Sequence, residues 1–265
     1  MSRKSLLWCL SLVLFISLHG CTGIVIGGET IRGSGDLSEE TYAFTGITGV
    51  QLSTTGELDI QLGDKEELRI ETDDNLLQYF EAEQDGGTLR IGTRRGFNLR
   101  PSGTVRYTLT VKELEFLGLS SSGNAHAPAL SADRFEIRIS SSGNVSVDGI
   151  DAGSLDVRIS SSGDVSVDGI DAGSLNVSIS SSGTVEIGEG VVDTQEIRIS
   201  SSGNYRGESV RSGRATVTVS SSGDARLWVE ESLDANLSSS GSVYYKGDPE
   251  VSDSHSSSGR VERIR

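Results

Sequence analysis

Residues 140–179 read SSSGNVSVDGIDAGSLDVRI followed by SSSGDVSVDGIDAGSLNVSI, two consecutive copies of one 20-residue unit. The copies differ only at Asn144/Asp164, Asp156/Asn176 and Arg158/Ser178. A fixed period of this length is typical of stacked repeats, in which each unit buries its apolar face only against its neighbours. This stretch therefore decides the fold class.

The tetrapeptide that opens each copy recurs through the second half of the chain. Its eight copies lie at 120–123, 140–143, 160–163, 180–183, 200–203, 220–223, 238–241 and 256–259. The first five steps between copies are equal, and the last two are each shorter by two positions. We interpret Ser53-Thr54-Thr55-Gly56 as an early, degenerate copy.

Apolar and polar residues alternate within the unit, which is the pattern of strands with one buried face. Leu155, Val157 and Ile159 predict one strand, and Val165 and Val167 predict a second strand after the Ser-Ser-Ser-Gly corner. The period is half that of a propeller blade, and aromatic residues make up only 5% of the chain. The sequence therefore predicts an all-β protein, a right-handed parallel β-solenoid of about 20-residue coils.

The solenoid is predicted to be a single domain over residues 41–265. Residues 41–118 would form irregular N-terminal coils, and residues 119–265 the regular repeats. A helix start at Asp73 or Asp74, followed by Leu76, Leu77 and Phe80, predicts a short helical cap over the first coil. Residues 21–40 are rich in Gly, Thr, Ser and Glu and are predicted to be a linker.

The start of the chain, over 1–20, has the features of an export signal. Arg3 and Lys4 precede an apolar run over 6–18, which is short for a membrane span. Leu18-His19-Gly20-Cys21 resembles a bacterial lipobox, so we expect a signal peptide over 1–20 and a lipid on Cys21 that anchors the protein in a membrane. Thr22 favours the outer membrane by resemblance to known sorting rules, and an ordinary secretory signal is the alternative.

The charge balance limits the partners. The chain has 23 basic and 38 acidic residues, a net charge of −15. Bulk electrostatics of this sign disfavour nucleic acid and anionic lipid as partners. The predicted mature chain holds one cysteine, Cys21, and so no disulfide.

The serine corners have a predicted structural role. Continued alternation turns the middle serines inward, where their hydroxyls form a ladder or bind corner backbone: Ser121, Ser141, Ser161, Ser181, Ser201 and Ser221. The glycine that follows suits a positive φ, and the Asn or Asp after it suits local backbone hydrogen bonds. A weak likeness to calcium-binding nonapeptide repeats leaves calcium as an alternative ligand of these turns, although no cofactor is expected.

Charged residues also recur at fixed positions of the unit. Glu136, Asp156 and Glu196 form an acidic column two residues before a basic column of Arg138, Arg158 and Arg198. Asp148, Asp151, Asp168 and Asp171 form short acidic columns and are candidate contacts for a cation or a sugar, with plain surface acidity as the alternative. Arg94 and Arg95 belong to a basic cluster with Phe97 and Arg100, which is either a contact site or an internal partner of acidic residues.

Several segments resemble one known family. They are Phe44-Thr-Gly-Ile-Thr-Gly-Val50, Gly56-x-Leu58-x-Ile60-x-Leu62-Gly63, Leu68-x-Ile70-x-Thr72, Gly87-Thr88-Leu89-x-Ile91 and the iterated Ser-Gly-Asn/Asp turns. Over roughly 42–245 the chain resembles the putative auto-transporter adhesin family with the head GIN domain. The resemblance implies an exported, frequently lipid-anchored bacterial β-solenoid, and it supplies no catalytic residues.

The sequence thus favours a non-enzymatic, lipid-anchored cell-envelope protein that acts in adhesion or binds envelope components, such as a glycan or a host or envelope protein. One alternative is a polysaccharide-active β-helix enzyme, which needs two positioned carboxylates or a metal in a groove. The other is a purely structural spacer. No Gly-x-Ser-x-Gly elbow accompanies the serines.

Overall fold

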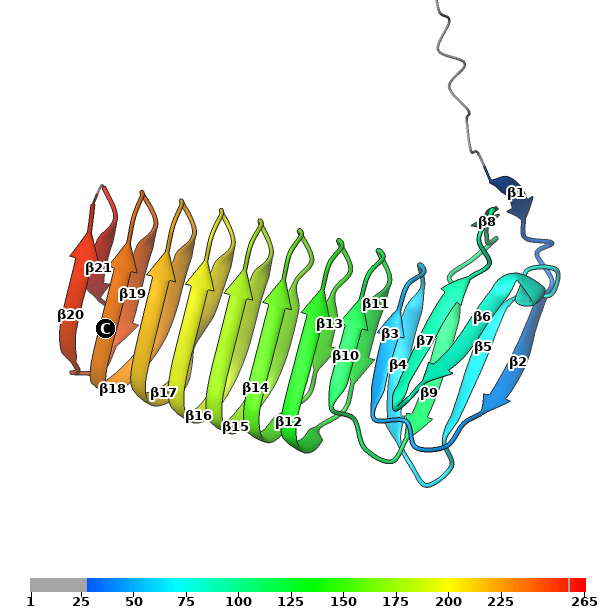
Figure 1. Cartoon of the computed structure of the whole chain (residues 1–265), viewed down its shortest axis with the longest axis horizontal. Helices are drawn as coiled ribbons and strands as arrows, with labels where there is room; N and C mark the ends of the chain where they lie inside the picture. The colour runs from blue at the N-terminus through cyan, green and yellow to red at the C-terminus, as the bar shows by residue number, and fades with distance from the viewer. Residues whose placement is uncertain (1–27, 257) are drawn as a thin grey trace, which may run out of the picture.

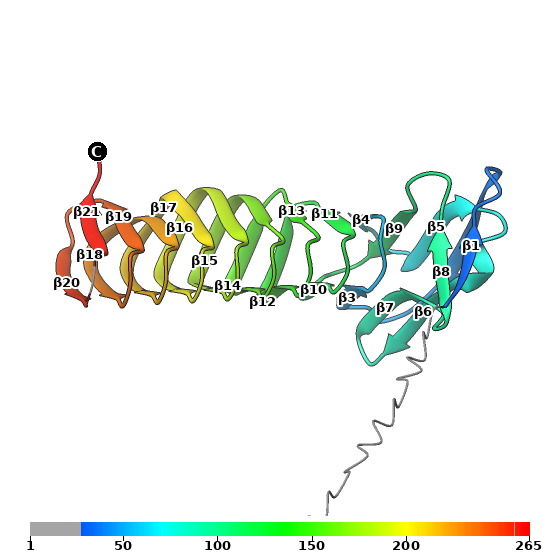
Figure 2. The same ribbon diagram turned by 90° about the horizontal axis from the view of Figure 1, so that it is seen from above.

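A computed structural model describes residues 28–256 and 258–265 of the chain. The described residues form 21 strands and one short 3-10 helix. The strands stack as successive coils along one axis, so the predicted right-handed parallel β-solenoid is confirmed (Figure 1). Seen from above, the coils form two layers that face each other across the core (Figure 2).

The N-terminal strands differ from the rest in their pairing. They are β1 (Glu29–Arg32), β2 (Leu37–Ala43), β3 (Gly49–Leu52), β4 (Glu57–Leu62), β5 (Glu67–Asp73), β6 (Phe80–Asp85), β7 (Thr88–Thr93), β8 (Phe97–Arg100) and β9 (Arg106–Val111). The 3-10 helix η1 spans Leu77–Tyr79. In this part, β2 pairs with β5, β5 with β9 and β6 with β7, all antiparallel.

The remaining strands form the regular coils and pair only in parallel. They are β10 (Phe116–Leu119), β11 (Asn124–Ala127), β12 (Leu130–Ile139), β13 (Val145–Val147), β14 (Ile150–Ile159), β15 (Val165–Ile179), β16 (Thr184–Ile199), β17 (Asn204–Val219), β18 (Asp224–Leu237), β19 (Ser242–Lys246), β20 (Glu250–His255) and β21 (Arg260–Arg263).

The register of these strands repeats the period of the sequence. Val157 lies opposite Val177, and Val177 lies opposite Ile197, so each residue pairs with the same position of the next repeat. The step from Val217 to Ala235 is shorter by two positions, and irregularities between Gly207 and Arg214 absorb the difference. Each coil therefore places the residues of the same repeat positions inside. Full burial of a large apolar side chain contributes roughly 1.5–3 kcal/mol to the free energy of folding.

The first coils are stacked out of chain order. Strand β3 lies between β7 and β10, and β4 lies between β9 and β11. Residues 49–62 thus form a coil inserted between residues 88–111 and the regular repeats. Leu52 lies opposite Leu119, and the Ser53 and Ser120 hydroxyls are hydrogen bonded at 3.0 Å, so 53–56 is confirmed as an early corner.

The N-terminal end of the core is closed mainly by antiparallel strands, and the predicted helical cap is reduced to one turn. Only the single 3-10 turn η1 forms near residues 73–80. Leu76 and Phe80 are buried there, and the Phe80 ring meets the Tyr107 ring edge-on at 6.0 Å. Too few apolar residues follow one another at helical spacing to sustain more turns.

The segment predicted as a linker is folded over much of its length. Strands β1 and β2 lie within or overlap residues 21–40. Strand β2 is an edge strand whose side chains are exposed except for half-buried Tyr42, so it has no apolar alternation to identify it. Backbone hydrogen bonds to β5 hold it, which composition does not reveal.

The glycines of the Ser-Ser-Ser-Gly corners do not have the predicted positive φ, whereas Gly56 of the early corner does, at 130°. The glycines with positive φ in the described chain are Gly35, Gly46, Gly56, Gly86, Gly96, Gly190 and Gly247, and none belongs to a Ser-Ser-Ser-Gly copy. A Cβ on Gly163 would instead lie 2.1 Å from the carbonyl oxygen of Gly143 in the preceding coil. Glycine is required because neighbouring backbones approach too closely for any side chain.

The C-terminal coil keeps the register but changes the character of its inward residues. Asp253 lies opposite buried Ala235, and His255 lies opposite buried Leu237. The His255 Nδ1 and Asp253 Oδ2 atoms are 2.9 Å apart. Val251 and Val261 of this coil still pack against the core, while Asp253 and His255 add polar groups at its end.

The predicted signal peptide over 1–20 and the predicted lipid site Cys21 lie outside the described residues. Within the described residues, no helix is long and apolar enough to cross a membrane.

Candidate binding groove

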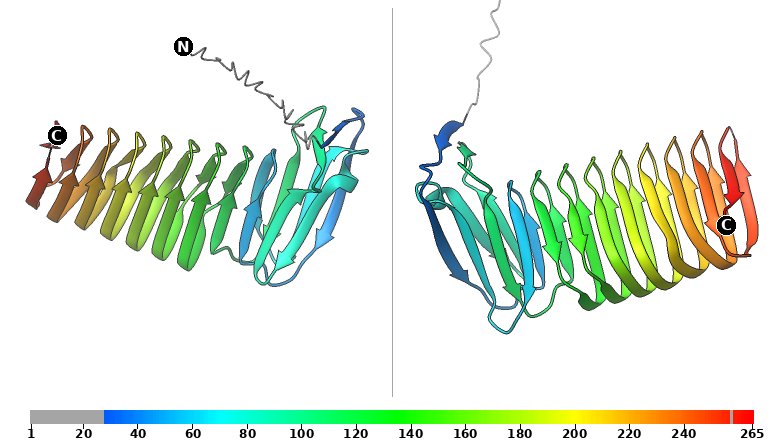
Figure 3. Two further views of the ribbon diagram at one scale, coloured as in Figure 1. Left: turned by 45° about the horizontal axis from the view of Figure 1, so that its top comes forward. Right: turned by 180° about the vertical axis from the view of Figure 1, so that it is seen from behind.

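One layer of the solenoid carries a groove on its outer face, lined by both apolar and polar residues. The layer contains β4, β11, β13 and the first residues of β15, β16 and β17, and it is seen from outside in the right view of Figure 3. Strand alternation turns every second residue outward. The outward residues align in register across six coils as Asp59, His126, Ser146, Ser166, Glu186 and Arg206.

The groove exists because the middle of this row is made of small residues. Ser146 and Ser166 form its floor, between His126 at one end and Glu186 at the other. Its volume is about 570 Å³. Glu57, Asn124, Asn144, Asp164 and Thr184 line the side next to the corners.

The Asn and Asp residues that follow the corner glycines bind the next coil. Asn124 Oδ1 accepts the N–H of Asn144 at 3.1 Å, and Asn144 Oδ1 accepts the N–H of Asp164 at 3.1 Å. Asp164 Oδ1 accepts the N–H of Thr184 at 2.7 Å. Thr184 has no side-chain carbonyl group to continue the series, so the N–H of Asn204 binds the backbone oxygen of Gly183 instead.

This ladder corrects the sequence-based expectation of hydrogen bonds within each turn. The bonded residues are 20 positions apart in the chain. Because each side-chain oxygen is held by the next backbone N–H, the side chains have fixed positions along the groove. The Asn144 amide also donates to Asn124 Oδ1 at 3.3 Å, so the Asn124 amide and the second Asp164 oxygen are the groups left to face a ligand.

The groove has an acidic lining and ends at one ion pair. Glu57, Asp59, Asp164 and Glu186 are anionic, and Arg206 is the one permanent cation among the described lining residues. The Arg206 and Glu186 side chains are 3.4 Å apart. At the other end, His126 Nε2 lies 3.8 Å from Asp148 Oδ1.

The candidate acidic residues do not line the groove, although Asp148 contacts His126, which does. Asp148, Asp151, Asp168 and Asp171 are all exposed. Asp151 lies opposite Asp171, and the column continues into exposed Val191. Across residues 28–256 and 258–265, no group of three or more His, Cys, Asp or Glu side chains is arranged to hold a metal ion.

The basic cluster lies in the N-terminal part of the molecule. Arg94 Nε is 3.6 Å from Glu81 Oε1 on β6, so its partner belongs to the cap and not to the regular stack. Arg95 is exposed in the turn before β8. Arg100 ends β8, next to Arg32 of β1.

The middle serines are only half-buried. Ser121, Ser141, Ser161, Ser181, Ser201 and Ser221 share this exposure, while both flanking serines of each corner are exposed and the glycine is buried. No side-chain hydrogen bond joins successive middle serines among the described residues. The first serine hydroxyls reach the previous coil instead, as Ser140 Oγ lies 3.5 Å from the Leu119 oxygen.

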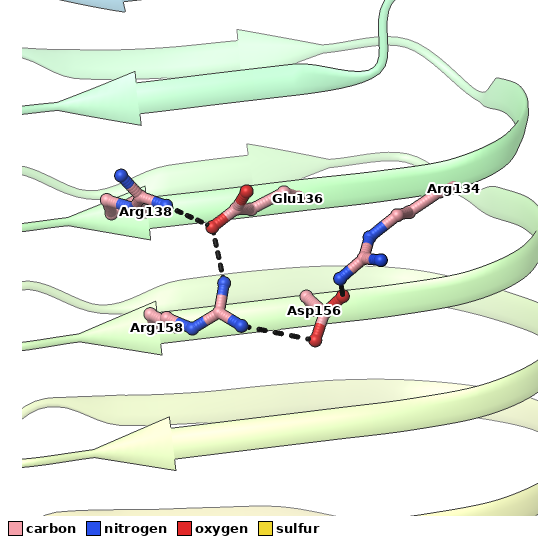
Figure 4. Close-up of polar contacts among 5 residues, drawn as sticks. All are labelled: Arg134, Glu136, Arg138, Asp156 and Arg158. Atoms are coloured by element: carbon pink, nitrogen blue, oxygen red, sulfur yellow. Dashed lines mark hydrogen bonds and ion pairs between the residues drawn. The ribbon is translucent and has the colours of Figure 1, made fainter.

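The opposite layer carries the predicted charge columns as a network of ion pairs (Figure 4). Glu136 contacts Arg138 at 2.6 Å in its own coil and also contacts Arg158 of the next coil. Asp156 is almost buried, 2.6 Å from Arg134 and 3.5 Å from Arg158. Arg134 was not identified from sequence, because it has no counterpart in neighbouring repeats.

The charges of this network are balanced by one another. Burial raises the pKa of Glu136, but the hydrogen bonds and charges of Arg138 and Arg158 outweigh it and hold that pKa below its usual range. Glu136 and Asp156 are therefore neutralised by their arginines. Among the described residues of the groove, Glu57, Asp59 and Asp164 have no such ion pair.

The repeat match decides the family. Two overlapping stretches, residues 44–169 and 136–249, match the family described as "Putative auto-transporter adhesin, head GIN domain". The chain belongs to this family. The two matches together cover well over half of the GIN-domain chain, and the resemblance drawn from its motifs is confirmed.

Solved structures share the fold of this GIN-domain protein. A "putative lipid binding protein" from Parabacteroides distasonis ATCC 8503 has a TM-score of 0.84 at 27% identity, with 89% of this chain and 100% of the other covered. A "putative adhesin" from Parabacteroides merdae ATCC 43184 has a TM-score of 0.85 at 21% identity, with 90% and 100% covered. No curated protein matches the chain.

Proposed function

We propose that this protein is a non-enzymatic, lipid-anchored adhesin of the cell envelope that binds a neutral or amino-sugar glycan in the groove. The observation that carries the proposal is the row of hydroxyl, amide and carboxylate groups across six coils. Coils lie about 4.8 Å apart, so these groups meet a linear chain at a regular spacing. The net negative lining disfavours anionic polysaccharides.

The groove geometry supports binding over catalysis. His126 contacts Asp148, and His255 contacts Asp253. Within the described chain, neither histidine is hydrogen bonded to a serine hydroxyl, as a serine nucleophile requires. The family description and the names of similar structures point to adhesion as well.

Binding of fractionated envelope glycans and host matrix proteins to the chain from Thr22 onward tests the proposal, with and without calcium. Ser166→Phe fills the floor of the groove and is expected to abolish binding. Ser178→Phe is the matched control, because Ser178 is also an outward serine but lies in the opposite layer. Absence of any bound glycan or protein favours a structural spacer, and release of sugar fragments favours an enzyme.

The lipid anchor has a separate test. Cys21→Ser in the full chain is expected to release the protein from membranes, because the thiol that would receive the lipid is gone. Membrane fractions of cells expressing either form are compared by immunoblot. Unchanged retention of the Cys21→Ser form contradicts the anchor.

Contact with lipid is a second candidate function. One similar structure carries the name "putative lipid binding protein", at 27% identity. The exposed Arg32, Arg95 and Arg100 in the N-terminal part give this candidate a location on the chain.

A further inference from the structure

Strands β1 and β8 form a two-stranded ribbon separate from the main sheet. They run parallel, with Thr30 opposite Asn98 and Arg32 opposite Arg100. The ribbon lies beyond the N-terminal coils, on the same side of the molecule as the Ser-Ser-Ser-Gly corners (Figure 1). At the start of the ribbon, the backbone of Gly28 packs directly against Gly96.

The two faces of this ribbon differ in chemistry. Ile31 and Leu99 pack against the core, and the Phe97 ring lies 4.6 Å from that of Tyr79. Alternation turns Thr30, Arg32, Asn98 and Arg100 to the other face, and all four are exposed. This face therefore offers two guanidinium groups, a hydroxyl and an amide.

The arrangement of the arginines favours an anion. Like charges directly opposite each other in a sheet are destabilising. Among the described residues, no ion pair involves Arg32, Arg95 or Arg100, although the chain as a whole has an excess of acidic residues. Guanidinium groups bind phosphate oxygens through paired hydrogen bonds.

We propose that the ribbon face of Arg32 and Arg100, with Arg95 beside it, binds the phosphate headgroups of the membrane to which the chain is anchored. The proposal rests on the proposed lipid anchor at Cys21. The short stretch from Cys21 to Gly28 allows a reach of at most about 25 Å. The ribbon is the nearest part of the folded body to that anchor.

The proposed headgroup binding is confined to the ribbon, whereas the net charge of the whole chain disfavours anionic lipid. The net charge of −15 repels an anionic surface, and the groove is acidic too. A basic face at one point of an acidic molecule orients it, because only that face is attracted within a Debye length of about 8–10 Å. The groove is then held away from the lipid surface.

Vesicle sedimentation of the unlipidated chain from Thr22 onward tests the proposal. This chain keeps every described residue, and all the strand pairs lie within it. We expect binding to phosphatidylcholine vesicles that contain phosphatidylglycerol, weaker binding at higher salt, and none to phosphatidylcholine alone. A double variant carrying Arg32→Gln and Arg100→Gln is expected to bind these vesicles more weakly, by about fivefold for each arginine removed.

Controls separate this result from other causes. Arg138→Gln with Arg198→Gln removes the same charge from the opposite layer of the stack, and it should leave vesicle binding unchanged. Equal binding to both vesicle types, or no effect of the ribbon variant in a chain with unchanged melting temperature, overturns the proposal. Complete competition by millimolar inorganic phosphate overturns it too, in favour of a free-anion site.

The outcome is independent of the anchor. Because the measured chain carries no lipid, vesicle binding is read whether or not Cys21 is lipidated in cells. A wrong proposal for the lipid anchor is detected only by the Cys21→Ser fractionation. A wrong proposal for the ribbon is detected only by the vesicle measurement.

Discussion

The two ends of the solenoid close the same core in different ways. At the N-terminal end, antiparallel strands, a 3-10 turn and buried Leu76 and Phe80 cover the last apolar layer. At the C-terminal end, a coil of unchanged geometry places Asp253 and His255 where its neighbour has Ala235 and Leu237. The N-terminal end thus differs from the regular coils in its strand arrangement, and the C-terminal end differs from them only in its residues. The N-terminal end therefore depends on contacts that occur nowhere else in the stack, and the C-terminal end does not.

Asp73 is the clearest of these unique contacts. Its carboxylate is buried and accepts the N–H of Gly35 at 2.7 Å, the N–H of Ser102 at 2.9 Å and the Ser102 hydroxyl at 2.6 Å. It thereby ties the loop after β1 to the loop after β8. Glu66 does the same for the turn before β3 by accepting the N–H groups of Gly46 and Ile47.

The largest expected effect is at Asp73. Asp73→Ala leaves three donors without their acceptor, and we expect the free energy of unfolding to fall by about 3 kcal/mol. Urea unfolding measures it. Asp85→Ala, which removes an exposed carboxylate, is expected to change stability by less than about 0.5 kcal/mol. Equal effects of the two variants would mean that the buried contacts of Asp73 do not hold the N-terminal end together.

A corner glycine in the middle of the stack should rank next. Gly163→Ala brings a Cβ to 2.1 Å from the Gly143 oxygen, and overpacking of this kind costs about 1–3 kcal/mol. Gly259→Ala in the last coil meets the Gly241 oxygen at 2.7 Å and has more room to relax. Thermal melting should therefore rank Gly163→Ala as the more destabilising.

Gly169→Ala is the control for both glycine variants. A Cβ there meets nothing within 4 Å, so stability should be unchanged or slightly higher. A loss at Gly169 equal to that at Gly163 would mean that backbone propensity, and not close approach, governs the corners.

Acid should weaken the N-terminal end. The Ser102 hydroxyl is the main cause of the lowered pKa of Asp73, which burial opposes and the N–H groups of Ser102 and Gly35 reinforce. Because the folded pKa lies below the unfolded value, the stabilisation is present above about pH 4 and is lost as pH falls through the folded pKa. Denaturant midpoints between pH 6 and about pH 2 measure it, and Asp73→Asn should flatten that dependence.

The smallest change in stability is expected at the C-terminal coil. Asp253→Ala with His255→Leu copies the residues of the preceding coil and should barely alter the free energy of unfolding. It should instead promote end-to-end association, because β20 and β21 have unpaired edges and would now present an apolar end. Sedimentation velocity over a range of concentrations detects this, and a strictly monomeric variant argues against a protective role for the two residues.

The contrast between the ends also explains what the sequence predicts well. The repeat of Leu155, Val157 and Ile159 specifies strands, inward faces and parallel register together, because identical neighbours stack best in register. The cap has no such repetition. The edge strand β2 is held by backbone pairing, and the insertion of residues 49–62 between later segments is a long-range arrangement that no local pattern encodes.

The groove was missed for a similar reason. Its floor consists of Ser146 and Ser166, the least distinctive residues of the unit, and its walls come from positions where the repeat varies, such as His126 and Glu186. The sequence does contain a signal for the groove, which appears when the same repeat position is compared between successive coils. At this position the residues are Asp59, His126, Ser146, Ser166, Glu186 and Arg206. A change from small to large residues along such a column marks a hollow.

The near-identity of residues 140–159 and 160–179 has a consequence for inheritance. Because the two units have the same inward residues, an in-frame duplication or loss of one unit keeps the apolar contacts with the neighbouring coils. The gene can therefore alter the length of the molecule in steps of about 4.8 Å without redesigning either end. Related strains should differ in coil number before they differ in the residues of the cap.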